Sequence, residues 1–252
     1  GTVYDATEQL EQKQSVEIFF CALNMIQKLM DCLDVAIYRV NKEKYARLFA
    51  YSSAKAASMG NTVYLPDKKS LDEACNENRV YINRSMEKEY PMMAYNVESE
   101  EQMEILIMLW SLPFERMTIN EANRLIVIGK LIQTSVRRAD RYLEALSEER
   151  YHSESQILKA LAFEELVGAY RKASKEKLTE YVLLQIEVEG ENEKETVDKF
   201  TSMLRESDYI GNLSDGKLYL LLTNTDLKGC SFVQNKLKQN GVASSISEEG
   251  RL

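Results

Sequence analysis

The chain has 252 residues, of which 44% are hydrophobic and 29% charged, a composition typical of a soluble globular protein with one large domain or two ordinary ones. Its net charge of -8 argues against a general nucleic-acid binder, which needs a basic face, but is compatible with a local basic pocket for a small anion. The only histidine, His152, argues against zinc sites built on several histidines and against Ser-His-Asp or Cys-His catalysis.

The four cysteines contain no C-x-x-C pair, which favours reduced thiols in a cytoplasmic compartment. No apolar run approaches the ~20 residues that a membrane helix needs. The chain starts with Gly-Thr rather than Met, and we expect membrane segments upstream of it to have been removed.

The first half predicts a helix, a strand pair, a third strand, a short helix, three more strands and a long helix. Apolar residues spaced three and four apart predict the first helix over residues 16–33. The strand pair is VAIYRV from Val35 and YARLFAYS from Tyr45, and Pro66 stops the strand NTVYLPD. A helix capped by Ser70 then precedes strands at 80–83, 92–97 and 102–110.

The long helix begins at about Thr118, which with Glu121 fits a capping box. A heptad-like seam follows, formed by Leu125, Ile128, Ile132, Ser135, Ala139, Tyr142 and Leu146. The seam either packs on the sheet of its own domain or belongs to a dimer interface that it shares with the N-terminal helix. The small and aromatic residues at the end of the seam favour a combination of both. The first part of the helix would pack on its own sheet and the last part would pair with a second chain, so we expect a homodimer.

This order resembles a GAF domain. The likeness includes SLDEACNENRVYIN, similar to the helix-then-strand segment of that family, and SLPFERMTINEANRLIVIGKLI, similar to its closing loop and helix. The resemblance implies an antiparallel sheet with flanking helices, which in this family either binds a small ligand or serves only for packing. No Cys or His stands where a tetrapyrrole would attach, and we expect an empty scaffold.

The second half predicts an α/β layer with an antiparallel hairpin at its centre. An amphipathic helix begins at Gln156 and a central strand at Tyr181. The helix KETVDKFTSMLRES is expected to contain Arg205 at its end, and a hairpin follows about an Asp-Gly turn at residues 215–216. A last helix stopped by Gly241 and a strand VASSIS complete the order.

Residues 157–249 resemble the GGDEF domain of diguanylate cyclases. In that family an inhibitory Arg-x-x-Asp step, which binds the product cyclic di-GMP, lies five residues before the signature hairpin. Here YIGNL separates Asp208 from SDGKL in the same register. The resemblance implies that Arg205 donates two hydrogen bonds, one to O6 and one to N7 of a guanine, while the Asp208 carboxylate accepts guanine N–H groups. It also implies a second basic residue from the last helix, for which Lys236 is the nearest match and Lys238 the alternative.

The signature itself departs from that of an active cyclase. Its two glycines are replaced by Ser214 and Asp215, its acidic pair by Gly216 and Lys217, and its final aromatic residue by Leu218. Lys217 would repel a divalent cation, and Glu187 alone cannot hold two magnesium ions. We therefore expect no catalytic residues, no metal site, no cofactor and no enzymatic activity.

The bare pattern predicts little, because Arg-x-x-Asp recurs at Arg137 and Asp140 on the long helix, where we expect a solvated face. The register to the hairpin is what distinguishes Arg205. We expect residues 214–218 to be a structural turn and His152 to be a solvated residue at the domain junction.

A GAF-like domain at 1–147 and a degenerate GGDEF-like domain at 148–252 together resemble the PelD-type cyclic di-GMP receptors of bacterial Pel exopolysaccharide synthesis. The resemblance implies a tether to the inner membrane, a place on its cytoplasmic face, and polysaccharide synthase proteins as partners. The alternatives are another degenerate GAF–GGDEF effector of cyclic di-GMP and a dimeric interaction scaffold without a ligand.

Overall fold

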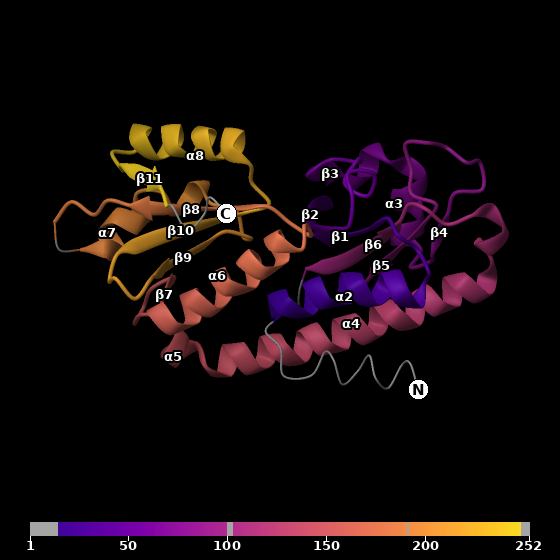
Figure 1. Cartoon of the computed structure of the whole chain (residues 1–252), viewed down its shortest axis with the longest axis horizontal. Helices are drawn as coiled ribbons and strands as arrows, with labels where there is room; N and C mark the ends of the chain where they lie inside the picture. Colours follow the sequence, from indigo (N-terminus) through magenta and orange to yellow (C-terminus); the bar gives the residue numbers. More distant parts are fainter. Residues whose placement is uncertain (1–14, 100–102, 191, 248–252) are drawn as a thin grey trace. The chain divides into compact units, whose positions relative to one another are not determined.

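The computed structural model describes residues 15–99, 103–190 and 192–247. The chain divides into two compact units, Gly1–Tyr142 and Leu143–Leu252, each built around its own sheet (Figure 1). The two units are called unit 1 and unit 2 below.

Unit 1 contains an antiparallel sheet of six strands in the order β3-β2-β1-β6-β5-β4. Each strand lies within a segment that the sequence predicts to be extended. Their bounds are β1 (Val35–Val40), β2 (Tyr45–Tyr51), β3 (Thr62–Tyr64), β4 (Tyr81–Ile82), β5 (Met93–Val97) and β6 (Glu104–Leu109).

Helices cover both faces of this sheet. Helices α2 (Ser15–Leu29) and α4 (Ile119–Ala145) lie on one face, where Gly129 of α4 approaches Tyr95 and Val97 of β5 (Figure 1). On the other face α3 (Lys69–Asn76) closes a core that includes Tyr38, Tyr81 and Trp110. Short 3-10 turns, η1 (Leu65–Asp67) and η2 (Phe114–Arg116), precede α3 and α4.

Three details of unit 1 differ from the prediction. Helix α2 ends at Leu29, so Leu33 lies in the following loop and exposes 79% of its surface. The N-cap position of α3 is Lys68 rather than Ser70. At the start of α4, Thr118 accepts the Glu121 N–H at 3.3 Å, but the Glu121 carboxylate pairs with neighbouring arginines instead of closing the box.

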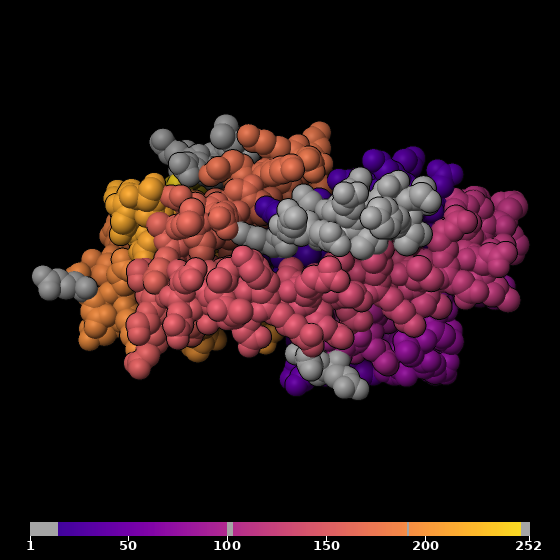
Figure 2. All heavy atoms as spheres, turned by 90° about the horizontal axis from the view of Figure 1, so that it is seen from below, coloured from indigo at the N-terminus to yellow at the C-terminus, as the bar shows by residue number. Residues whose placement is uncertain are grey.

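The predicted seam of α4 is buried in its first half, where Leu125, Ile128 and Ile132 are enclosed, whereas Tyr142 is 66% exposed. The outer side of α4 is visible along much of its length in Figure 2. Its exposed residues include the polar Asn123 and Lys130 and the apolar Val127, which is 54% exposed. The early part of the helix therefore packs as expected, and the homodimer stays a prediction. In the described ranges, no helix combines the length and apolarity that crossing a membrane requires.

Unit 2 contains a five-stranded sheet in the order β11-β8-β10-β9-β7, antiparallel except for the parallel pair of β7 and β9. The strands are β7 (Ile157–Leu158), β8 (Tyr181–Ile186), β9 (Tyr209–Asn212), β10 (Leu218–Thr223) and β11 (Ser244–Ile246). The predicted hairpin about the Asp-Gly turn is therefore formed by β9 and β10.

Helices flank this sheet on both faces, as Figure 1 shows for α6 and α8. Helix α6 (Ala160–Lys175) packs on one face, where Tyr170 contacts Tyr181. Helices α7 (Glu193–Asp198) and α8 (Leu227–Gln239) cover the other, with the turn η3 (Thr201–Met203) and a core around Phe200. A short helix, α5 (Ser147–Arg150), precedes them all.

Two predicted helices of unit 2 are shorter than expected. Ile157 and Leu158 are paired in β7, so α6 begins at Ala160 rather than at Gln156. The next helix ends at Asp198 and a separate 3-10 turn ends at Met203, so Arg205 does not lie in a helix. The predicted fold class, a GAF-like antiparallel sheet with flanking helices followed by a GGDEF-like α/β domain, is confirmed.

Two glycines of unit 2 provide a test of its packing. A Cβ atom at Gly211 of β9 would lie 2.3 Å from Cγ of Phe163, a fully buried residue of α6, whereas one at Gly168 of α6 would meet nothing within 4 Å. We expect Gly211→Ala to lower the free energy of unfolding by about 1–3 kcal/mol through overpacking. Gly168→Ala, the control, should raise it by about 0.5–1 kcal/mol, because Ala is the better helix former. Urea unfolding measures both, and equal effects would contradict this packing.

Candidate functional site

Arg205 and Asp208 lie in the loop between η3 and β9 and form a tight turn. The Asp208 N–H donates to the Arg205 carbonyl at 3.0 Å, and Asp208 immediately precedes β9, which begins at Tyr209. The structure therefore brings the two predicted residues together, in a loop rather than at a helix end.

The Asp208 carboxylate fixes this turn to the neighbouring strand. Its Oδ2 accepts the Arg205 N–H at 3.2 Å, and its Oδ1 accepts the N–H of Thr223, the last residue of β10, also at 3.2 Å. Only 3% of the Asp208 side chain is exposed. Asp208 is thus a structural anchor of the turn as well as a candidate ligand.

The Arg205 guanidinium reaches across the same junction. Its Nε lies 3.8 Å from Asp208 Oδ2, and its Nη2 donates to Thr225 Oγ1 at 3.3 Å. Thr225 in turn donates to the carbonyl of Thr223. Arg205 still exposes 35% of its side chain, so it is held in place and accessible. The sequence interpretation missed both threonines, because it placed them at the end of the predicted strand KLYLLLTNT, whereas β10 ends at Thr223.

Two opposing influences act on the pKa of Asp208. Burial raises the pKa of this carboxyl above its usual 3.8, while the Arg205 charge and the N–H groups of Arg205 and Thr223 oppose the rise. The balance is upward, so burial is the larger effect. The folded protein consequently holds a proton on Asp208 more tightly than the unfolded chain does.

A hollow of about 510 Å³ lies beside the turn, a size within the usual range for small-molecule sites. One part of its lining comes from the turn itself, including Arg205, Glu206 and Asp208. The remaining lining residues are Tyr151, Ser155, Gln156, Leu158, Thr201, Leu204, Tyr209 and Ile210.

Residues 150–159, here called the edge hairpin, supply part of this lining. Tyr151 bridges Leu158, and the Lys159 N–H donates to the Arg150 carbonyl at 2.7 Å, so the segment folds back on itself beside β9. His152, expected to be simply solvated, has its Nε2 2.7 Å from Asn212 Oδ1. The edge hairpin is therefore attached to the sheet by both backbone pairing and a side chain.

Lys236, the predicted second basic residue, lies on the exposed surface of α8. Its Nζ is 4.5 Å from the centroid of the Phe232 ring, a cation–π contact. Among the contacts of the described residues, none joins Lys236 to Arg205 or Asp208.

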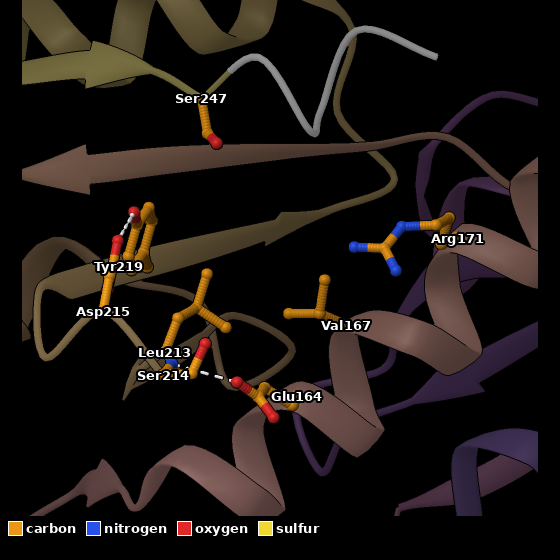
Figure 3. A pocket seen from close by; sticks show the side chains of 8 residues that line it. All are labelled: Glu164, Val167, Arg171, Leu213, Ser214, Asp215, Tyr219 and Ser247. Carbon is orange, nitrogen blue, oxygen red and sulfur yellow. Dashed lines mark hydrogen bonds between the residues drawn. The ribbon is translucent and has the colours of Figure 1, made fainter.

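The degenerate signature turn lies at a second hollow of about 460 Å³, shown in Figure 3. There the Ser214 N–H donates to Glu164 Oε1 at 2.9 Å, and Asp215 accepts the Tyr219 hydroxyl at 2.6 Å and the Lys217 N–H at 2.9 Å. The Tyr219 hydrogen bond is the main cause of a lowered pKa of Asp215. These polar groups hold the turn to α6 and β10.

The described acidic residues of unit 2 form no metal-binding cluster. Glu187 is exposed and follows the end of β8, and within the described ranges no cluster of three or more His, Cys, Asp or Glu side chains could hold a metal ion. The other Arg-x-x-Asp step also differs from the candidate site: Arg137 and Asp140 are half-buried on α4, and Asp140 accepts the Ser15 hydroxyl.

Each of the two units thus has its own sheet with helices on both faces, the fold class that the sequence predicts. No protein family model matches the chain, and no curated protein matches its sequence. Among solved structures it is similar to PelD from Pseudomonas aeruginosa, at 12% identity and a TM-score of 0.43, over 98% of this chain and 89% of that chain.

PelD from the same organism in complex with cyclic di-GMP is similar at 13% identity and a TM-score of 0.43, over 98% of this chain and 89% of that one. A methyl-accepting chemotaxis protein is similar at 8% identity and a TM-score of 0.42, over 54% of this chain and 98% of its own. Structures of PelD are thus among the solved structures to which this chain is similar, at low identity.

The balance of charges at the turn can be tested without a ligand. Because Arg205 opposes the rise in the pKa of Asp208, Arg205→Ala should raise that pKa further. A raised carboxyl pKa stabilises the folded state fully below pH 3.8, and this contribution is lost as the pH rises through the folded-state pKa. The stability lost in Arg205→Ala should therefore be largest at neutral pH and shrink on acidification.

Carboxyl NMR titration, assigned with Asp208→Asn, measures this pKa, and urea unfolding across the acid range measures the stability. An Asp208 pKa below 3.8 in the unsubstituted protein would contradict the burial described here.

Proposed function

We propose that this chain is a catalytically inactive receptor for cyclic di-GMP, which it binds at the turn that carries Arg205 and Asp208. The observation that carries the proposal is the Arg205 guanidinium, which a buried carboxylate holds in place and which remains 35% exposed beside a hollow of about 510 Å³. The five residues that separate Asp208 from the signature turn, the register of an inhibitory site, support the same conclusion.

In this proposal Arg205 donates to guanine O6 and N7, a pair of acceptors that matches its planar fork. Asp208 holds Arg205 in position. The family resemblance gives its carboxylate a second role as acceptor of a ligand N–H group, although both of its oxygens already accept backbone N–H groups. Lys236 approaches a phosphate of the ligand from α8. No cofactor takes part, and cyclic di-GMP is the only small molecule required.

The proposal assigns residues 1–147 to the GAF-like domain and 148–252 to the degenerate GGDEF-like domain. Cyclic di-GMP would bind one arrangement of the protein more tightly and shift the population toward it. The proposed output is Pel-type exopolysaccharide synthesis, through contacts with synthase proteins at the cytoplasmic face of the inner membrane. A homodimer tethered by preceding membrane segments completes the proposal.

Isothermal titration with cyclic di-GMP tests the site. We expect saturable binding that Arg205→Ala weakens by about 5- to 150-fold, the range expected for loss of a bidentate base contact. Arg137→Ala, which removes the arginine of the other Arg-x-x-Asp step, should leave the affinity unchanged. Undiminished binding by a folded Arg205→Ala protein would eliminate this site, and no binding by the unsubstituted protein would favour the scaffold without a ligand.

Incubation with magnesium and GTP tests the absence of catalysis. We expect no cyclic dinucleotide, because the signature turn lacks an acidic pair and its Asp215 already accepts the Tyr219 hydroxyl and the Lys217 N–H. Product analysis by chromatography is the measurement, with an active cyclase as the positive control. Turnover that disappears in Glu187→Ala would refute the proposal of an inactive protein.

A further inference from the structure

Glu206 stands between the two residues of the motif and differs from Asp208 in what its carboxylate can do. It is exposed and lines the hollow, and in the part of the chain that the structure describes it has no hydrogen-bond or ion-pair partner. The Asp208 carboxylate is 97% buried by side-chain area, and each of its oxygens already accepts a backbone N–H. Of these two carboxylates, Glu206 is therefore the more accessible to a ligand.

The other walls of the hollow suit a planar base. The edge hairpin contributes Tyr151, whose ring centroid lies 5.7 Å from the Arg150 guanidinium, and β9 contributes Tyr209, so two aromatic residues line the hollow together with Glu206. Bases stack on such side chains with little regard to their identity. Selectivity between bases must then come from polar groups, which in this lining include Arg205, Glu206 and Gln156.

A carboxylate distinguishes guanine from adenine by charge and hydrogen bonding. The Watson–Crick edge of guanine presents two adjacent donors, N1–H and the 2-amino group, which the two oxygens of one carboxylate can accept. Adenine presents an acceptor at N1 and has no 2-amino group, so the same carboxylate would face a lone pair. A site built to accept these donors therefore rejects the base that lacks them.

We propose that Glu206 is the specificity-determining residue of this site and accepts the Watson–Crick donors of a guanine, while Asp208 positions Arg205. This inference rests on the proposed function, since it requires that cyclic di-GMP binds at the Arg205 turn. It assigns recognition of the base edge to a residue inside the motif rather than to the aspartate that defines it.

Whether Glu206→Gln weakens or tightens the binding of cyclic di-GMP separates a direct hydrogen bond from a long-range effect of charge. Cyclic di-GMP carries two negative phosphates, so removing any nearby acidic side chain should tighten its binding if that side chain makes no direct contact. A direct hydrogen bond predicts the opposite, a weaker complex. Glu176→Gln is a matched control, because Glu176 is an exposed residue of the same unit that does not line the hollow.

The test measures the affinities of the unsubstituted protein, Glu206→Gln, Glu176→Gln and Arg205→Ala for cyclic di-GMP and cyclic di-AMP by isothermal titration, with thermal unfolding to verify the fold. We expect Glu206→Gln to weaken cyclic di-GMP binding by about tenfold or more. Its binding of cyclic di-AMP should stay the same or improve, so the preference for guanine falls. Glu176→Gln should keep both affinities and the preference.

The outcomes distinguish the two proposals. If Arg205→Ala loses binding while Glu206→Gln binds cyclic di-GMP as well as Glu176→Gln does, the role of Glu206 is wrong and the receptor function stands. If the unsubstituted protein does not bind, or Arg205→Ala binds undiminished, both proposals are overturned. A lower affinity with an unchanged preference would also contradict base reading by Glu206.

Discussion

The carboxylate of Asp208 is the contact on which the candidate site depends. It accepts the N–H groups of Arg205 and Thr223, which belong to segments that meet only in the folded chain. A carboxylate with 3% exposure costs desolvation energy, and these hydrogen bonds together with the Arg205 charge offset part of that cost. Removing the carboxylate would leave two backbone donors without their acceptor. Arg205 is thus held by the fold before a ligand arrives, which lowers the entropic cost of binding.

Much of the fold could be predicted because the information is local. Strands such as β1 and β5 are short apolar runs bounded by turns, and the hairpin of β9 and β10 surrounds a turn in which Gly216 adopts a φ of +76°. The start of α6 was predicted wrongly because a distant contact decides it. Ile157 and Leu158 fit the apolar pattern of the following helix, but pairing with β9, some fifty residues later, makes them a strand. No local pattern could indicate that partner.

At the site too, features set by local sequence could be predicted, whereas features set by contacts between distant segments could not. The spacing of Arg205, Asp208 and the hairpin is a property of the sequence, and it led to a turn in which Arg205 and Asp208 do lie together. The burial of Asp208 depends on the end of β10, and the exposure of Glu206 depends on which side of the turn faces the hollow. A motif defined by spacing identifies the loop, but it does not say which of its carboxylates is free to bind.

The two turns of unit 2 show what separates a structural loop from a candidate binding loop. In the signature turn, Asp215 accepts the Tyr219 hydroxyl and the Lys217 N–H, and the Ser214 N–H is bound to Glu164. These polar groups therefore hold the hairpin together. The turn at Arg205 divides the tasks, because Asp208 satisfies the backbone while Arg205 and Glu206 remain accessible beside the hollow. A site can discriminate between ligands only if its fixed polar groups are not already satisfied by the protein.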